Sequence, residues 1–320
     1  MKRILIIQTA FLGDVILATP VVSELHRLFP ESEIDVLVKK GNASLLTGNS
    51  KINEVFVLDK SSGKWKAIQS LIKTFRKNNY DLIVNLHRFG SSGLIASLSK
   101  AKQVYGFSKN PFSFLYTKKF EHNIGNGMHE VERNLSIIKE FGAQSKVRPE
   151  LFPSEKDHQA VEAYIGSSFV CIAPASVWYT KQLPEAKWKE LIDQIRDKRV
   201  LLIGGKDDIE LCERIKSDTE NKNVTNLAGQ FSLLQSAALI QKASHVYVND
   251  SGPLHIASAM NIPTTAFFCS TVPSFGFGPL AEINEIREVN GLDCRPCGLH
   301  GHKSCPKNNF RCGNEMNVRI

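Results

Sequence analysis

The stretch His245-Val246-Tyr247-Val248-Asn249-Asp250-Ser251-Gly252-Pro253-Leu254-His255-Ile256-Ala257 changes its character in the middle. Its first four residues are apolar or aromatic and are typical of a buried strand. Pro253 is favoured in the first turn of a helix, so that a helix is predicted from there onward. Strand, short loop and helix in this order form the repeating unit of an α/β fold with a parallel sheet.

The loop of this unit, residues 250–252, has the features of an anion site. The first N–H groups of a helix have no partner within the helix, and the helix dipole adds positive potential at the same point. Gly252 permits a phosphate to approach the backbone closely, and His255 in the first turn is placed to donate to a phosphate oxygen. The alternative is that Asp250 or Ser251 only caps the helix.

The same alternation extends to both sides of this stretch. Strands are predicted at 4–7, 34–38, 55–58, 82–85, 104–107, 169–173, 200–203, 245–248 and 264–268. Helices are predicted at 20–29, 68–76, 93–98, 184–196, 209–215, 231–242 and 253–260. Gly142, Pro149 and Pro153 mark a linker between the halves. We therefore predict an α/β fold with domains at 1–150 and 151–290, followed by a cysteine-rich tail at 291–320.

Two further strand ends in the second half carry polar side chains. The segment after residue 173 contains Ser176 and Lys181, whose hydroxyl and ammonium groups suit phosphate oxygens. Gly204-Gly205 follows the next strand, and Asp207 or Asp208 is then placed to accept from ribose hydroxyls. Lys181 as a solvated surface lysine and an aspartate as a helix cap remain open as alternatives.

The first half begins with a strand that leads into Gln8-Thr9-Ala10-Phe11-Leu12-Gly13-Asp14. The dinucleotide fingerprint G-x-G-x-x-G is absent here, which disfavours a nicotinamide site. Gly13 permits a tight turn, and Asp14 then stands at the start of the first helix. Asp14 is either a general base or a residue that stabilises the helix dipole.

Two segments resemble the signatures of glycosyltransferase family 9, the ADP-heptose:lipopolysaccharide heptosyltransferases. The first is Phe11-Leu12-Gly13-Asp14-Val15 with Thr19-Pro20, and the second runs over residues 249–257. The resemblance implies a GT-B fold, in which two Rossmann-like domains face each other across a cleft. It also implies that the first domain binds the acceptor and the second binds the donor, with inversion at the anomeric carbon and no metal ion.

The resemblance assigns roles residue by residue. It makes Asp14 the catalytic residue. We expect Thr9 and Gly13, in the same loop, to lie on the acceptor side. On the donor side it places Lys181 at the phosphates, Asp208 loosely at the ribose, and Asp250, Ser251 and Gly252 in the phosphate loop, next to Ser176 and His255. The chain departs from the family around Lys181, because Val177-Trp178-Tyr179 replaces a segment richer in Thr, Asp and Arg.

The expected reaction is heptose transfer from ADP-heptose to a lipid A-linked lipopolysaccharide core acceptor. One alternative is a glycosyltransferase that uses another nucleotide sugar. Alternatives from other classes are a nucleotide-dependent oxidoreductase and a non-catalytic nucleotide-sugar-binding protein. Donor binding without turnover would distinguish the last of these.

The net charge of the chain indicates which kind of partner it can bind. The chain has a net charge of +8, and Lys100, Lys102, Lys109, Lys118 and Lys119 lie among aromatic residues. This pattern suits an anionic membrane surface better than a nucleic-acid groove, so we expect no nucleic acid as a partner. The apolar run near Met1 is too short for a signal peptide and no stretch is long enough to span a bilayer. We expect a cytoplasmic protein, peripheral at the inner face of the inner membrane.

The seven cysteines fall into two groups. Cys171, Cys212 and Cys269 lie in or beside apolar segments and are expected to fill the core. The tail holds Cys294-x-x-Cys297, Cys305 and Cys312, a spacing that suits a structural zinc ion, with His300 and His302 as spare ligands. The alternative is a reduced cysteine-rich loop. No cofactor is expected to be required for the reaction.

Overall fold

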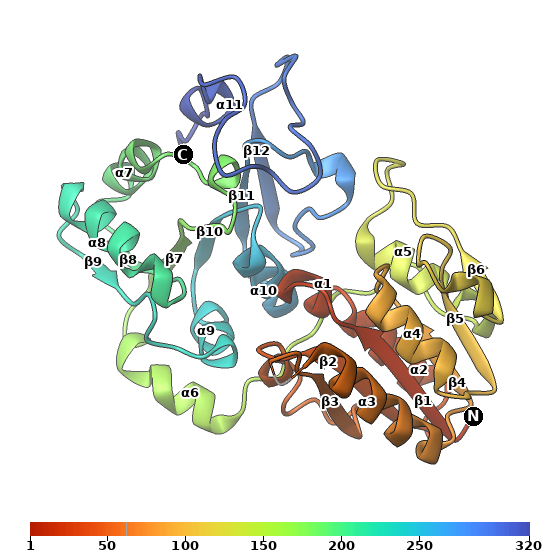
Figure 1. The fold of residues 1–320 in the computed structure, drawn as a ribbon. Coiled ribbons are helices and arrows are strands. Elements are labelled where there is room, and N and C mark those ends of the chain that lie inside the picture. Colours follow the sequence, from red (N-terminus) through yellow and green to blue (C-terminus); the bar gives the residue numbers. More distant parts are fainter. Residues whose placement is uncertain (62) are drawn as a thin grey trace. The chain divides into compact units, whose positions relative to one another are not determined.

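The computed structural model describes residues 1–61 and 63–320. The chain divides into two compact units (Figure 1). The N-terminal unit comprises residues 1–124 and 130–152, and the C-terminal unit comprises residues 125–129 and 153–320. The main division falls between Phe152 and Pro153.

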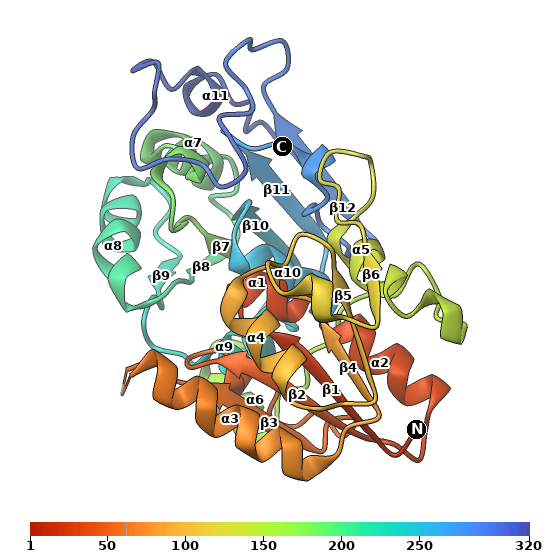
Figure 2. The ribbon, with the colours of Figure 1, turned by 45° about the vertical axis from the view of Figure 1, so that its right-hand side comes forward.

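The N-terminal unit is built on a parallel sheet of six strands. In chain order these are β1 (Arg3–Gln8), β2 (Glu33–Lys39), β3 (Glu54–Leu58), β4 (Leu82–Asn85), β5 (Gln103–Phe107) and β6 (Lys118–Phe120). Its helices are α1 (Leu12–Ile16), α2 (Thr19–Leu28), α3 (Lys64–Asn78), α4 (Gly90–Leu98) and α5 (Glu130–Ser136). Helices α3 and α4 pack side by side on one face of the sheet (Figure 2).

The C-terminal unit repeats this plan. Its strands are β7 (Phe169–Ala173), β8 (Arg199–Leu202), β9 (Val224–Asn226), β10 (His245–Asn249), β11 (Thr264–Phe268) and β12 (Asn284–Glu288), again all parallel. Its helices are α6 (Glu155–Val161), α7 (Glu185–Gln194), α8 (Ile209–Asp218), α9 (Leu233–Ile240), α10 (Gly252–Met260) and α11 (Arg311–Asn314).

Both sheets have the same strand order. It is β3-β2-β1-β4-β5-β6 in the N-terminal unit and β12-β11-β10-β7-β8-β9 in the C-terminal unit. Each order matches the doubly wound Rossmann pattern, in which the direction of winding reverses beside the first strand. The predicted fold class, α/β of the GT-B type with two Rossmann-like units, is confirmed. The reversal points lie between β1 and β4 and between β7 and β10, and ligands bind at such points in open α/β sheets.

The core of each unit explains why these strands form. Ile4, Leu5, Ile6 and Ile7 of β1 are fully buried, as is typical of a central parallel strand covered on both faces. In the C-terminal unit Trp188 of α7 is fully buried and packs edge-on against Phe267 of β11. Within residues 1–61 and 63–320, no helix combines the length and the apolar character that crossing a bilayer demands.

Nine strands were predicted and all nine are present, with boundary shifts of at most one residue at an end. The sequence failed to indicate β6, β9 and β12, which are all edge strands of three to five residues. Their side chains are largely polar because only one neighbour covers them, and this removes the apolar run on which the prediction depends. The short helices α5, α6 and α11 were also not predicted, whereas a helix start at Asp14 was expected and is present as α1.

Candidate active site

At the reversal point of the N-terminal sheet, a threonine and a histidine are hydrogen-bonded. Thr9 follows β1 and His87 follows β4, and Thr9 Oγ1 lies 2.7 Å from His87 Nδ1. Burial lowers the pKa of His87 to about 4, and the positive charges of Lys60, Arg88 and Lys39 act in the same direction. His87 is therefore neutral at physiological pH, and its ring both accepts and donates.

Asp14 lies in the first turn of α1, the helix that follows β1. Its Oδ2 accepts the N–H of Phe11 at 3.1 Å, so that Asp14 does cap its own helix. Burial raises the pKa of Asp14 to about 6 and the charge of Glu130 contributes, while the Phe11 N–H and Arg88 act against the rise. A carboxylate with a pKa near 6 is a stronger base than an ordinary aspartate and is still ionised at pH 7. The capping and the general-base interpretation are thus compatible.

Glu130 belongs to a buried cluster at the start of α5. Its carboxylate accepts from His122 Nε2 at 2.9 Å and from Arg133 Nε at 2.8 Å. All three side chains are almost fully buried. Burial alone would raise the pKa of Glu130, but the hydrogen bonds and charges of His122 and Arg133 outweigh it and lower the pKa. Glu130 therefore stays ionised and supplies a fixed negative charge near Asp14.

At the reversal point of the C-terminal sheet, a lysine and an aspartate form an ion pair. Lys181 lies in the loop after β7 and Asp250 follows β10, with 2.8 Å between Lys181 Nζ and Asp250 Oδ2. Thr271, which follows β11, donates its hydroxyl to the same carboxylate oxygen at 2.6 Å. Lys181 is therefore not a solvated surface lysine, because its side chain is mostly buried in this pair.

The loop that carries Ser176 and Lys181 is held to β10 by one side chain. Asn249 accepts the N–H of Leu183 at 2.9 Å and donates to the carbonyl of Pro174 at 2.7 Å. These bonds join the two ends of the loop to the last residue of β10. Ser176 lies within the loop, and its carbonyl accepts from Gln182 Nε2 at 2.6 Å.

Helix α10 begins beside the ion pair. Ser251 is its N-cap residue, but the hydroxyl of Ser251 lies 3.4 Å from the carbonyl of Asn249 and does not cap the helix. His255 in the first turn is buried, and among the described residues its Nδ1 has no hydrogen-bond partner. Burial lowers the pKa of His255 to about 4. A neutral buried imidazole therefore lies in the first turn of a helix whose start is not capped by a side chain.

Asp208 has a local partner. It accepts the N–H of Gly205 at 2.7 Å at the start of the turn that leads into α8, as the capping alternative predicts. Burial raises its pKa, opposed by the Gly205 N–H and assisted by the charge of Asp207. Because β8 neighbours β7 in the sheet, Asp208 lies at the same edge as Ser176, one strand further from β10. Its predicted ribose contact stays a prediction.

The C-terminal tail supports the donor-side loops. The His302 N–H donates to Thr180 Oγ1 at 2.7 Å, and the Thr180 N–H donates to the carbonyl of His302. The side chain of Arg295 is buried, and its guanidinium donates to the carbonyls of Phe268, Cys269 and Thr271. The tail therefore holds the segment that contains Lys181 through the bonds of His302 to Thr180, and holds Thr271 through the bond of Arg295 to its carbonyl.

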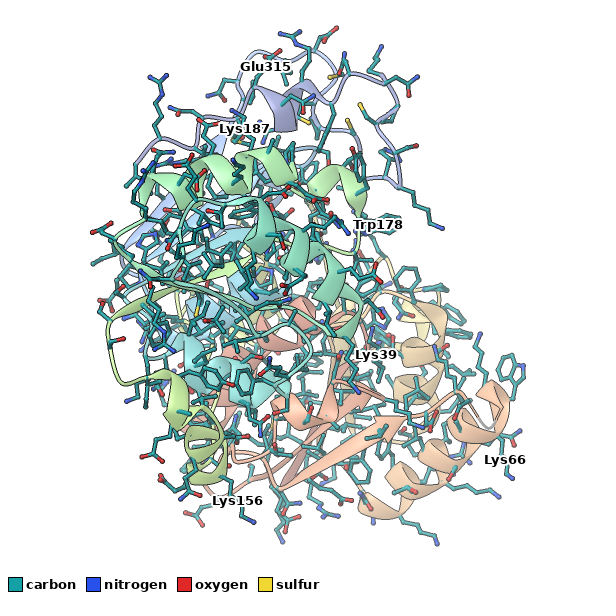
Figure 3. The ribbon with its side chains drawn as sticks, turned by 90° about the vertical axis from the view of Figure 1, so that its left-hand side faces the viewer. Lys39, Lys66, Lys156, Trp178, Lys187 and Glu315 are labelled. Atoms are coloured by element: carbon teal, nitrogen blue, oxygen red, sulfur yellow. The ribbon has the colours of Figure 1, made fainter. Side chains whose placement is uncertain are left out.

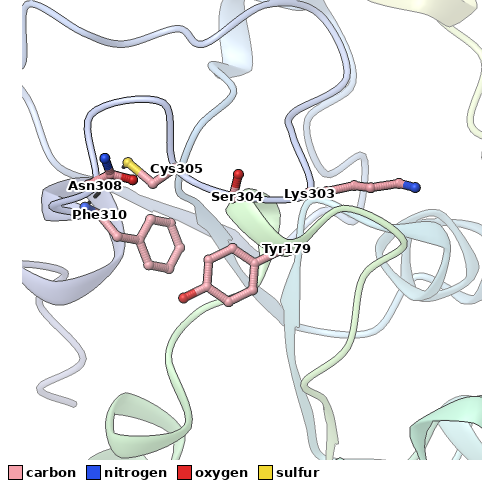
Figure 4. A pocket seen from close by; sticks show the side chains of 6 residues that line it. All are labelled: Tyr179, Lys303, Ser304, Cys305, Asn308 and Phe310. Atoms are coloured by element: carbon pink, nitrogen blue, oxygen red, sulfur yellow. Dashed lines mark hydrogen bonds between the residues drawn. The ribbon is translucent and has the colours of Figure 1, made fainter.

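A cavity of about 330 Å³ lies between the tail and the loop that carries Lys181 (Figure 4). It is lined by Tyr179, Lys303, Ser304, Cys305, Asn308 and Phe310. Neighbouring thiols contribute to raising the pKa of Cys297, after burial, so the cysteines of the tail lie near one another. However, within residues 1–61 and 63–320 no three His, Cys, Asp or Glu side chains converge as metal ligands. The tail cysteines are therefore not arranged as a set of metal ligands in this structure, and the zinc site at Cys294, Cys297, Cys305 and Cys312 stays a prediction.

Several residues of these two edges were not singled out from the sequence. They are His87, Arg88 and Glu130 in the N-terminal unit, and Asn249 and Thr271 in the C-terminal unit. His87 and Asn249 sit at the ends of strands that flank the reversal points, and the strand-order rule indicates such positions once the topology is known. Glu130 lies far along the chain from Asp14, and Thr271 lies 21 residues from Asp250, so only the folded structure brings each pair together.

This chain is similar to known proteins in sequence and in fold. A family model described as glycosyltransferase family 9 (heptosyltransferase) matches residues 68–307. Lipopolysaccharide heptosyltransferase 3 of Escherichia coli is 32% identical over 280 residues, which cover 82% of this chain and 82% of that protein.

Solved structures show the same fold. The Escherichia coli ADP-heptose lipopolysaccharide heptosyltransferase II has a TM-score of 0.79 at 22% identity, covering 98% of each chain. The Escherichia coli heptosyltransferase WaaC with ADP-2-deoxy-2-fluoro heptose has a TM-score of 0.69 at 21% identity, covering 89% of this chain and 92% of that one. With a family model that spans three quarters of its length, the chain belongs to glycosyltransferase family 9 and is a glycosyltransferase.

Proposed function

We propose that this enzyme transfers a heptosyl group from ADP-heptose to the lipopolysaccharide core on a lipid A-linked acceptor, with inversion and without a metal ion. The donor is held by the C-terminal unit and the acceptor by the N-terminal unit. The observation that carries the proposal is the ion pair of Lys181 with Asp250 beside the uncapped start of α10. The name of the Escherichia coli relative supports the choice of sugar and acceptor.

The donor diphosphate is bound by cationic and N–H groups. Lys181 supplies an ammonium group, and the start of α10 supplies the N–H of Gly252 and the positive end of the helix dipole. Pro253 has no N–H, and the Leu254 N–H donates to the Ser251 carbonyl. His255 is neutral and donates one ring N–H to a phosphate oxygen. Asp250 holds Lys181 in place and, with Thr271, prevents its side chain from extending into solvent. Ser176 and Asp208 contact the donor from the two neighbouring strand ends.

The chemical step forms one bond and breaks one. An acceptor hydroxyl attacks the anomeric carbon while the bond from that carbon to the diphosphate oxygen breaks, so that ADP leaves with the electron pair. Asp14 takes the hydroxyl proton as general base, and a pKa near 6 suits this role at neutral pH. Thr9 and His87 orient the acceptor at the same sheet edge.

Negative charge grows on the departing diphosphate. Lys181, the α10 dipole and the His255 N–H stabilise this charge, which is the task that a divalent cation performs in other transferases. Such preorganised donors are most effective in a site that excludes water. The side chains of Lys181 and His255 are mostly buried, and are therefore shielded from water as this role requires.

The protein is proposed to act in the cytoplasm, peripheral at the inner face of the inner membrane. The lipid-linked acceptor requires access to a membrane surface, and the excess of positive charge suits anionic lipid.

The test is a donor panel on the purified chain. ADP-heptose is expected to raise the melting temperature more than UDP- or GDP-sugars, and to be consumed with release of ADP only when the acceptor is present. Product analysis by NMR is expected to show the inverted anomeric configuration. Stabilisation by NAD alone would favour the oxidoreductase instead, and donor binding without turnover on any acceptor would favour a binding protein.

A further inference from the structure

The net positive charge of the chain comes from the N-terminal unit. This unit has 22 basic and 13 acidic residues, whereas the C-terminal unit has 18 basic and 19 acidic residues. Residues 60–119 alone contain twelve Lys or Arg and a single acidic residue, Asp81, which pairs with Lys102. Charge segregated in this way indicates a surface that meets an anionic partner.

Large apolar side chains are exposed within the same segment. Phe114 is 70% exposed, Phe89 is 67% exposed and Leu115 is 50% exposed. The ring of Phe112 lies 6.5 Å from that of Phe114, and a side chain at Gly90 would contact it. We call Phe89, Phe112, Phe114 and Leu115 the Phe114 patch.

Asn110 joins the two loops that form the Phe114 patch. Its amide donates to the carbonyls of His87 at 2.9 Å and Phe89 at 3.0 Å, and its Oδ1 accepts the N–H of Phe112 at 3.0 Å. Asn110 is buried, so these bonds are protected from water. The patch is therefore a defined surface and not two independent loops.

The patch adjoins the proposed acceptor site. Its two loops follow β4 and β5, at the same sheet edge as Thr9. The rings of His87 and Phe89 lie 5.0 Å apart, and His87 is the residue that bonds Thr9. An apolar group resting on the Phe114 patch would thus lie beside the residues that orient the acceptor hydroxyl.

Basic residues lie within the two loops of the patch and on a neighbouring helix. Lys109 precedes Asn110 in the second loop and Arg88 precedes Phe89 in the first, and Lys60 is close enough to influence the pKa of His87. On neighbouring α3, Trp65 is 63% exposed between Lys64 and Lys66, and Lys66 is seen at the surface of this helix in Figure 3. Helix α3 contains no acidic residue. Aromatic rings with lysines and arginines around them are typical of groups placed at a membrane interface.

We propose that the Phe114 patch docks onto a bilayer containing anionic lipid and presents the lipid-linked acceptor to Thr9 and His87. Phe114, Leu115 and Phe89 enter the headgroup region, while Lys109 and Arg88 contact lipid phosphates. This inference rests on the proposed function, because that function supplies the lipid-linked acceptor. A second copy of the chain is a poorer occupant, because it would bring a surface of the same strong positive charge against this one.

The experiment measures binding of the full-length protein to vesicles by co-sedimentation. Vesicles of phosphatidylcholine mixed with phosphatidylglycerol are compared with vesicles of phosphatidylcholine alone. The wild type is expected to bind the mixed vesicles and to be released by salt. The double variant Phe114→Ser/Leu115→Ser is expected to lose about tenfold or more in binding, because two large apolar side chains no longer enter the interface. Lys109→Glu is expected to lose binding to the mixed vesicles as well.

Matched controls come from the C-terminal unit. Ile209→Ser/Ile283→Ser removes two exposed apolar side chains, and Lys222→Glu reverses one exposed lysine; both are expected to bind like the wild type. Equal binding by the patch variants and the wild type would overturn the proposal, as would equal binding to neutral vesicles. A wild-type dimer that dissociates in Phe114→Ser/Leu115→Ser would assign the patch to a second copy instead and also overturn it.

Turnover separates this proposal from the proposed function. On a deacylated, soluble acceptor the patch variants are expected to match the wild type, which also shows that they fold. On the same acceptor carried in mixed vesicles they are expected to be slower. A wild type without turnover on either acceptor would contradict the proposed function, while the vesicle binding would still decide the docking surface.

Discussion

Lys181 Nζ lies 2.8 Å from Asp250 Oδ2, and this ion pair joins the loop after β7 to the loop after β10 at the reversal point of the C-terminal sheet. The N-terminal sheet has a counterpart in the hydrogen bond of Thr9 with His87 between the loops after β1 and β4. The two units thus use the same topological position, with a charged pair in one and a neutral pair in the other. A charged pair suits a charged ligand, and a neutral pair suits a hydroxyl group.

Lys181→Gln is expected to weaken both catalysis and folding. Removing one charge-stabilising donor typically costs about 10²–10³ in rate. It also leaves Asp250 buried without its cation, and breaking a buried pair from one side costs about 3 kcal/mol. Turnover and urea unfolding measure the two effects. Lys216→Gln, which removes an exposed pair with Glu213, is the control and should change neither. If Lys181→Met/Asp250→Leu recovers stability but not turnover, the pair serves the ligand and not the fold.

Asp14→Asn is expected to lower kcat by a factor of at least about 10² while donor affinity is kept. The amide fits the same space and still caps α1, but it cannot take a proton. In the wild type, kcat/KM is expected to rise with pH and level off above about pH 6, because the base must be ionised. A variant with near-normal turnover would remove Asp14 from the role of base.

Glu130→Gln is expected to shift this pH profile toward lower pH. Glu130 is ionised and helps to raise the pKa of Asp14, so its removal lowers that pKa and makes Asp14 a weaker base. At neutral pH kcat should fall modestly, while the acidic limb of the pH profile moves to lower pH. Glu31→Gln, an exposed carboxylate at the opposite end of the sheet, is the control. If the acidic limb of the Glu130→Gln profile stays at the same pH, and turnover is lower by the same factor at every pH, then Glu130 has only a structural role.

The sequence predicted the framework of the fold because the buried strands carry it. Ile4–Ile7 and Phe169–Ala173 are apolar throughout, and central parallel strands need that. The edge strand Asn284–Glu288 has one apolar residue of five and a largely exposed surface, so no pattern marked it. Strand order was likewise not visible, because a run of apolar residues does not say which strand is its neighbour.

The candidate site was predictable in part for the same reason. Asp14, Lys181 and Asp250 follow strands that the sequence indicates, and their loops carry recognisable residues. Glu130 acts on Asp14 from 116 positions away, and Arg295 holds Thr271 through backbone carbonyls, which leave no mark in the residue pattern. Partners of this kind depend on tertiary packing alone.

The cysteine tail gives a further prediction. The thiols of Cys294, Cys297 and Cys305 are partly exposed, and no three ligands of the described chain converge on a metal position. We therefore expect purified protein to contain less than stoichiometric zinc and its tail thiols to react with an alkylating reagent without prior chelation. Stoichiometric zinc, lost together with thermal stability on treatment with a chelator, would restore the zinc site predicted from the spacing.

The buried His255 makes stability depend on pH in a defined window. Its pKa is about 4 in the folded chain, against an ordinary value of 6.5, so the unfolded chain binds the proton more readily. The stabilisation that His255 contributes is therefore present above about pH 6.5 and is lost as the pH falls toward 4. A shift of this size corresponds to about 3 kcal/mol. We expect the Tm of His255→Gln to fall less than that of the wild type between pH 6.5 and 4. His26→Gln, on α2 of the other unit, is the control. Parallel curves for the wild type and His255→Gln would contradict this prediction, because they would show that the pKa of His255 is the same in the folded and the unfolded chain.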